Sequence, residues 1–127
     1  MREFLNITKA LADETRLRII LALRNRELCV CQIITFLGLA PSTVSEHLSM
    51  LTKAGLIEKR KSGKWAFYRL TSENGSHEIK VALSWVCKTL AEKRKIREDF
   101  SQLKKILGQS LDEICCEVKK KSEAGRS

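Results

Sequence analysis

The sequence predicts a mainly helical protein with a small β-hairpin. Two segments with helical spacing of apolar residues, 29–37 and 41–54, are joined by a short turn that contains Gly38. A basic segment follows at once, with Ser62 and Gly63 as a turn between two β-favouring runs. The order helix, turn, helix, hairpin is that of a winged helix-turn-helix.

The remaining elements are predicted from apolar spacing and from end signals. Residues 3–12 and 13–24 have helical spacing, with Asp13 as the N-cap of the second segment. Pro41 suits the first turn of the 41–54 helix, which ends at Gly55. Ser110 and Glu113 have the spacing of a capping box, so a short helix is expected there, followed by a disordered tail over 120–127.

The segment from 78 to 107 predicts one helix of unusual length. Its apolar residues recur at spacings of three, four or their multiples, and about 30 residues at 1.5 Å each span roughly 45 Å. A chain of this size would leave such a helix partly uncovered, either as an exposed helix or, as we expect, as a helix paired with its twin. The sequence therefore predicts a homodimer through the N-terminal and long C-terminal helices. It also predicts a domain over 1–107 and a cysteine-bearing segment over 108–127.

The composition of the chain limits the classes of binding partner that are expected. The chain has 127 residues, enough for one hydrophobic core, and 24 basic against 15 acidic residues give it a formal charge of +9. This excess favours an anionic partner, nucleic acid first and an acidic membrane surface second. There is no run of 18 apolar residues and no apolar signal-peptide core near the N-terminus, so no membrane partner and a cytoplasmic location are expected.

A DNA-binding face is predicted on the second helix of the motif and on the hairpin. Short polar side chains at the start of that helix suit contacts in a major groove, and basic hairpin side chains suit the DNA backbone. Polar helix faces are usually only solvated, so the prediction depends on the ordered combination with the positive charge. His47 has no second histidine four residues on and is expected to contact DNA. The candidates are Ser42, Thr43, Ser45, Glu46 and His47 on the helix, with Lys59, Arg60, Lys61 and Lys64 on the hairpin.

Three stretches together resemble one known family. They are "LADETRLRIILAL", "ELCVCQI" and "STVSEHLSMLTKAGLIEKRKSGKWAFYRL", and the likeness covers about residues 5–70. They are similar to the ArsR/SmtB family of winged-helix repressors. The resemblance implies a homodimer that binds a palindromic operator in double-stranded DNA and releases it when a metal or metalloid ion binds. "ELCVC" resembles the arsenic-sensing branch in particular.

The cysteines at positions 29 and 31 are the first candidate site for such an ion. Thiolates select soft ions such as trivalent arsenic and antimony, and the start of a helix favours thiolates. Residues two apart on an ideal helix point about 200° apart, so Cys29 and Cys31 share an ion only if that first turn is distorted. Distortion there would reorient the following helix. The alternative is that both are small helix residues, one of them buried.

A third sulfur is missing from this local motif. The arsenic-sensing pattern commonly has a third cysteine three residues after the second, where this chain has Ile34. Cys115 and Cys116 are favoured to supply the sulfur or to form a second site, over Cys87, which is expected to be buried in the dimer seam. Cys115 and Cys116 could also be plain members of a short amphipathic helix. The odd count of five cysteines argues against a disulfide framework.

The predicted function is a DNA-binding transcriptional repressor that As(III) or Sb(III), bound to cysteine thiolates, releases from its operator, with no organic cofactor. A thiol-based redox sensor or a sensor of another soft metal is the alternative. The zinc site of the family's other branch cannot be assembled, since His77 is the only further histidine. An enzyme is not expected, because no Gly-rich or Arg-rich loop surrounds any cysteine.

Overall fold

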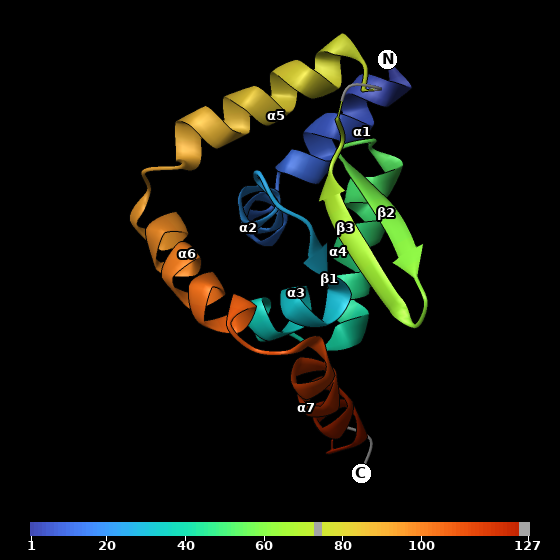
Figure 1. Ribbon diagram of the computed structural model, residues 1–127. Helices are drawn as coiled ribbons and strands as arrows, with labels where there is room; N and C mark the ends of the chain where they lie inside the picture. The colour runs from blue at the N-terminus through green and yellow to red at the C-terminus, as the bar shows by residue number, and fades with distance from the viewer. Residues whose placement is uncertain (73–74, 125–127) are drawn as a thin grey trace.

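A computed structural model describes residues 1–72 and 75–124 of the chain, with side chains up to residue 119 (Figure 1). The described elements, in chain order, are α1 (Arg2–Leu11), α2 (Glu14–Ala22), β1 (Leu28–Cys29), α3 (Val30–Leu37), α4 (Pro41–Lys53), β2 (Ile57–Ser62), β3 (Trp65–Leu70), α5 (His77–Leu90), α6 (Arg94–Leu107) and α7 (Leu111–Ala124). This arrangement confirms the predicted mainly helical fold with a small β-hairpin. None of the described helices is long and apolar enough to cross a bilayer.

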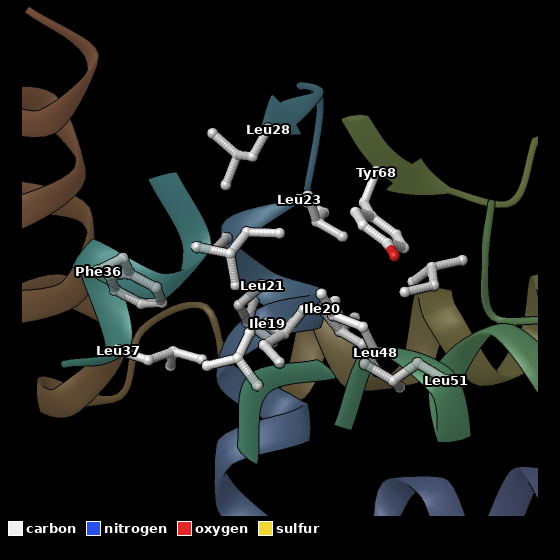
Figure 2. Close-up of a cluster of buried hydrophobic side chains, with 14 of the residues drawn as sticks. Ile19, Ile20, Leu21, Leu23, Leu28, Phe36, Leu37, Leu48, Leu51 and Tyr68 are labelled. Carbon is white, nitrogen blue, oxygen red and sulfur yellow. The ribbon is translucent and has the colours of Figure 1, made fainter. Parts of the chain in front are cut away.

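Helix α2 lies at the centre of the core, with the other elements around it (Figure 1). Its buried side chains, Ile19 to Ala22, belong to one cluster with residues from β1, α3, α4 and β3, and Leu17 is half-buried beside it. Each large aliphatic side chain buried in this way contributes roughly 1.5–3 kcal/mol to the stability of the fold. Figure 2 shows this cluster, which includes Ile19, Ile20, Leu21, Leu23, Leu28, Phe36, Leu37, Leu48, Leu51 and Tyr68.

The predicted helix ends are confirmed where a specific residue makes the cap. The Asp13 side chain accepts a hydrogen bond from the Arg16 N–H at 3.1 Å, which satisfies a free donor at the start of α2. Gly38 ends α3 in the left-handed conformation, with φ of +67°, and Pro41 is the first residue of α4. Ser110 Oγ accepts the Glu113 N–H at 3.3 Å and caps α7.

The sheet has three antiparallel strands in the order β1-β3-β2. Strands β2 and β3 form the predicted hairpin. The two-residue strand β1 is new: Leu28 pairs with Tyr68, and Cys29 pairs with Phe67. The prediction of a helix that includes Cys29 was therefore wrong by one residue, because the backbone of Cys29 pairs with β3 and the helix begins at Val30.

The prediction of one long helix from 78 to 107 was wrong. The chain forms two helices, α5 and α6, with a break at residues 91–93. Folding back at the break brings α6 against α2 and α3, where Ile96, Leu103 and Ile106 are buried. Because the chain turns, most of the apolar stripe of α6 is covered within one protomer, although Leu107 stays exposed.

Helix α7 packs along α3, with Ile114 fully buried between them. It continues to Ala124, so the tail predicted to be disordered from residue 120 is helical up to that point, and residues 125–127 lie outside the described residues. The domain division at residue 108 stays a prediction.

Candidate DNA-binding face and thiol site

Helix α4 divides into a core face and an outer face. Val44, Leu48 and Leu51 are buried against the core. The outer face carries the five polar residues that the sequence singled out, of which Ser42, Ser45 and Glu46 are exposed and Thr43 and His47 are half-buried. Burial of one stripe thus fixes which side of α4 faces outwards, and that side bears short hydrogen-bonding groups suited to base edges.

His47 differs from its neighbours in having a partner from another helix. Arg16 Nη1 lies 3.2 Å from His47 Nδ1. The same guanidinium donates from Nε to the Ala10 carbonyl at 2.8 Å and from Nη2 to the Lys9 carbonyl at 3.0 Å. Arg16 therefore joins the end of α1 to the outer face of α4.

The four predicted hairpin cations are all exposed, but two of them have partners within the chain. Arg60 forms a two-bond ion pair with Glu27 at 2.5 and 3.1 Å and lies over the Phe67 ring. This pairing lowers the pKa of Glu27 and raises that of Arg60. Among the described residues, neither Lys59 nor Lys61 forms an ion pair.

Lys64, at the tip of the hairpin, has an acidic partner from α7. Its Nζ lies 3.2 Å from Asp112 Oδ1 and 4.8 Å from the centre of the Trp65 ring. The Lys64–Asp112 ion pair is exposed, so water weakens it. It nevertheless places the acidic first turn of α7 beside a cation expected to contact DNA.

The cysteine sulfurs of positions 31 and 115 meet where α7 packs on α3. Cys31 and Cys115 are joined as a disulfide, with Cα atoms 5.6 Å apart and 84 positions between them in sequence. The odd cysteine count argued against a disulfide framework, and it leaves room for this single bridge, which the sequence did not predict. The packing of α7 on α3 supplies the proximity.

The other three cysteines are separate from this bridge in different ways. Cys29 is buried at the end of β1, with its N–H donating to Gln32 Oε1 at 2.8 Å, and Cys116 is exposed. Cys87 is half-buried on α5, where burial raises the pKa of its thiol and nearby Arg24 acts against that rise. Within the described part of the chain, no three or more His, Cys, Asp and Glu side chains are grouped as a metal site. Thus the structure joins only Cys31 and Cys115 of the four predicted metal ligands.

Sequence reasoning missed Arg16, Glu27 and Asp112. Asp112 stands three residues before Cys115, a spacing that places both on one face of a helix, so the sequence contained a usable signal for it. Arg16 and His47 are 31 positions apart, and Glu27 and Arg60 are 33 apart. No local spacing rule connects residues so far apart.

The chain is similar in sequence to known bacterial regulatory proteins. The profile of the family "Bacterial regulatory protein, arsR family" matches residues 13–59. An "Arsenical resistance operon repressor" of Escherichia coli is 41% identical over 85 residues, which are 65% of this chain and 73% of that protein. An "Arsenic resistance transcriptional regulator ArsR2" of Pseudomonas putida is 33% identical over 116 residues, 87% of this chain and 96% of that protein. A "Cadmium resistance transcriptional regulatory protein CadC" of Listeria innocua is 43% identical over 61 residues, 47% of this chain and 51% of that protein.

Solved structures agree on the fold. HlyU from Vibrio cholerae has a TM-score of 0.61 and 31% identity, covering 72% of this chain and 95% of that one. A homodimeric winged helix-turn-helix DNA-binding domain from Mycobacterium bovis has a TM-score of 0.61 and 29% identity, covering 73% of this chain and 82% of that one. The chain therefore belongs to the arsR family of bacterial regulatory proteins, a family of winged-helix, DNA-binding transcriptional regulators and not of enzymes.

Proposed function

We propose that the protein is a repressor that leaves its operator when trivalent arsenic or antimony bridges Cys31 and Cys115. The observation that carries the proposal is the meeting of these two sulfurs across the α3–α7 contact. In the reduced protein, two thiols react with arsenous acid to form two sulfur–arsenic bonds and release two molecules of water. Soft thiolates favour such an ion over hard cations. The relatives named for arsenical resistance support the same class of inducer.

Cys29 is the favoured source of a third sulfur. It precedes the first residue of α3 and lies two positions before Cys31, so the separation of about 200° between such positions on an ideal helix does not apply to this pair. Replacing the last arsenic hydroxyl with the Cys29 thiol would release a third water. Cys116 is exposed and adjacent to Cys115 on the same helix, which makes it the weaker candidate.

Two contacts of α7 would connect the thiol site with the residues proposed to face DNA. Asp112 and Cys115 are three residues apart on α7, so holding Cys115 against α3 also holds Asp112 beside Lys64. Asp112 would then compete with a DNA phosphate for that lysine. In addition, Glu117 and Val118 of α7 lie over the Gly38–Leu39 turn that leads into α4, around a small cavity of about 40 Å³. Clamping α7 would restrain the turn that sets the position of the DNA-facing helix.

The operator-binding form is proposed to be a homodimer on a palindromic site. Large apolar side chains are exposed on two neighbouring helices, Phe4 and Leu5 on α1 with Val81 and Trp85 on α5. A second copy covering these residues would remove them from water. Two-fold pairing would also present two α4 helices, as half-sites about 34–36 Å apart on one DNA face require.

Operator binding by reduced protein, with and without arsenite, tests the thiol site. Cys31→Ser and Cys115→Ser should keep the wild-type operator affinity and lose release by arsenite, because each removes one of the two sulfurs that join α3 to α7 through the ion. Cys87→Ser, at a cysteine remote from the α3–α7 contact, is the matched control and should respond like wild type. Normal release by Cys115→Ser would contradict the proposed bridge.

X-ray absorption of the arsenite-bound protein would count the sulfurs around arsenic. We expect three in wild type and Cys116→Ser, and two in Cys29→Ser. An unchanged count in Cys29→Ser would remove Cys29 from the site and leave Cys116 as the remaining candidate near the bridge.

The observed disulfide favours a second candidate, release by thiol oxidation. The Cys31 and Cys115 thiols would give up two protons and two electrons to a small disulfide such as oxidised glutathione, which would leave as two thiols. Forming the Cys31–Cys115 disulfide would hold α7 against α3, as a bridging ion would. Oxidised protein that binds the operator as tightly as reduced protein, with no metalloid present, would contradict this candidate, and a cadmium titration would test the wider soft-metal alternative.

A further inference from the structure

The Arg16 side chain is held in place by several contacts within the protein. Its guanidinium donates to the carbonyls of Lys9 and Ala10 in the last turn of α1, and the Lys9 carbonyl also accepts the Ala12 N–H. Its backbone N–H is bound by the Asp13 cap, and the Asp13 carboxylate lies 3.9 Å from Nη1. Only 11% of the side chain is exposed. The nitrogen that remains, Nη1, is aimed at His47 Nδ1.

This contact determines where the proton of a neutral His47 ring resides. A guanidinium has only donors and keeps its charge, so the nitrogen facing it has to be the acceptor. A neutral imidazole carries one N–H, which must then be on Nε2. Nε2 lies on the far side of the ring from Arg16. The contact thus leaves His47 with a donor directed away from the α1–α2 junction.

We infer that Arg16 is a positioning residue that holds His47 as a hydrogen-bond donor toward DNA. The inference rests on the proposed DNA-facing role of α4. An Nε2–H donor matches a phosphate oxygen, a purine N7 or the guanine O6, and it mismatches the amino groups of adenine and cytosine. Arg16 would thereby select the class of DNA atom that His47 binds. It would also connect α1, a proposed dimer helix, with the recognition surface.

The proton position can be measured directly on the reduced full-length protein, without DNA. Two-bond ¹H–¹⁵N NMR of the imidazole nitrogens, at a pH where the ring is neutral, should show His47 wholly as the Nε2–H form. Arg16→Lys should show a mixture of the two forms, because a lysine has one flexible ammonium in place of the fixed fork. Arg24→Lys, at an arginine that lies over Phe100 instead, is the matched control and should match wild type. A wild-type ring protonated on Nδ1, or an Arg16→Lys ring indistinguishable from wild type, would overturn the inference.

Two substitutions of His47 test the donor role in the complex. Glutamine places its amide near the Nε2 position and asparagine places its amide near Nδ1. His47→Gln should stay within a few-fold of the wild-type operator affinity, while His47→Asn should bind about tenfold more weakly. A loss confined to the operator would assign a base atom as the acceptor, and an equal loss on non-specific DNA would assign a phosphate.

The outcomes separate this inference from the proposed function. Equal operator affinities of His47→Asn and His47→Gln would overturn the donor role. The release of wild-type protein by arsenite depends on the cysteines alone and would still stand. Conversely, failure of arsenite release would leave the Arg16 effect on the His47 proton untouched.

Discussion

At the scale of single residues, the hairpin cations differ in how available they are to DNA. Arg60 is held by Glu27, and Lys64 is held by Asp112. Because the hydrogen bond from Arg60 lowers the pKa of Glu27, the carboxylate stays charged to a lower pH than an isolated glutamate, and the pair is lost only when acid protonates it. Lys61 has no such partner among the described residues and needs no rearrangement to meet a phosphate.

Lys61→Ala should weaken binding to operator and to unrelated DNA by similar factors. Loss of one phosphate contact releases fewer counterions, so the slope of log affinity against log salt should fall by about one unit. Fluorescence anisotropy over a salt series would measure the slope, with Lys104→Ala on α6 as a control that removes the same charge elsewhere. A changed sequence preference with an unchanged salt slope would assign Lys61 to base contacts instead.

At the scale of elements, α6 is held in its folded-back position by a buried ion pair. Arg18 Nε and Nη2 donate to the two Asp99 oxygens at 2.9 and 3.1 Å, and Asp99 is almost fully buried. The same guanidinium lies 5.2 Å from the Phe36 ring centre. This pair therefore joins α6 to α2 and, through Phe36, to α3. Helix α7, which carries Cys115, follows α6 in the chain and packs on the same helix α3.

Asp99→Ala should lower the free energy of unfolding by about 2–4 kcal/mol, because it leaves the Arg18 guanidinium partly buried without its partner. Urea unfolding would measure the loss. Glu98→Ala, at the preceding position, is the control. The Glu98–Arg94 ion pair is exposed, with 3.9 Å between Arg94 Nε and Glu98 Oε1, so this substitution should lower the free energy of unfolding by no more than about 0.5 kcal/mol. Similar losses in the two variants would show that the buried pair does not hold α6.

At the scale of the whole molecule, α1 and α5 carry four large exposed apolar side chains, while Leu39, Met50 and Leu107 are exposed elsewhere. Trp85 is 65% exposed. It borders a groove of about 380 Å³ whose lining includes Leu11, Leu17 and Leu90. Deleting everything after residue 77 would be a poor test of a dimer, because Ile79, Leu83 and Leu103 would be lost from the core.

A point substitution tests the dimer without removing core residues. Trp85→Glu should give a folded monomer that binds a palindromic operator weakly, because a carboxylate in the seam would be buried without a partner. Analytical ultracentrifugation and circular dichroism would measure mass and folding. Leu107→Glu, at an exposed apolar residue of α6, should remain a dimer. A Trp85→Glu protein that sediments as a dimer would place the interface elsewhere.

The sequence by itself determined the features that depend on neighbours in the chain. Asp13, Gly38 and Pro41 mark helix ends through contacts within a few residues or through their own backbone preferences, and all three predictions were confirmed. Apolar spacing identified the buried face of α4, and a turn signal identified the hairpin. Local signals of this kind are sufficient to predict the order of the helix-turn-helix and the wing.

Only the tertiary structure decided the features that depend on distant segments. Helical periodicity is the same on both sides of residues 91–93, so the pattern contains no sign that α6 turns back to dock on α2 and α3. Pairing with β3 took Cys29 out of its predicted helix. The Cys31–Cys115 bridge and the Arg16–His47 contact join residues 84 and 31 positions apart. Such contacts arise from how packed elements are placed in space, and short-range spacing along a chain does not encode that placement.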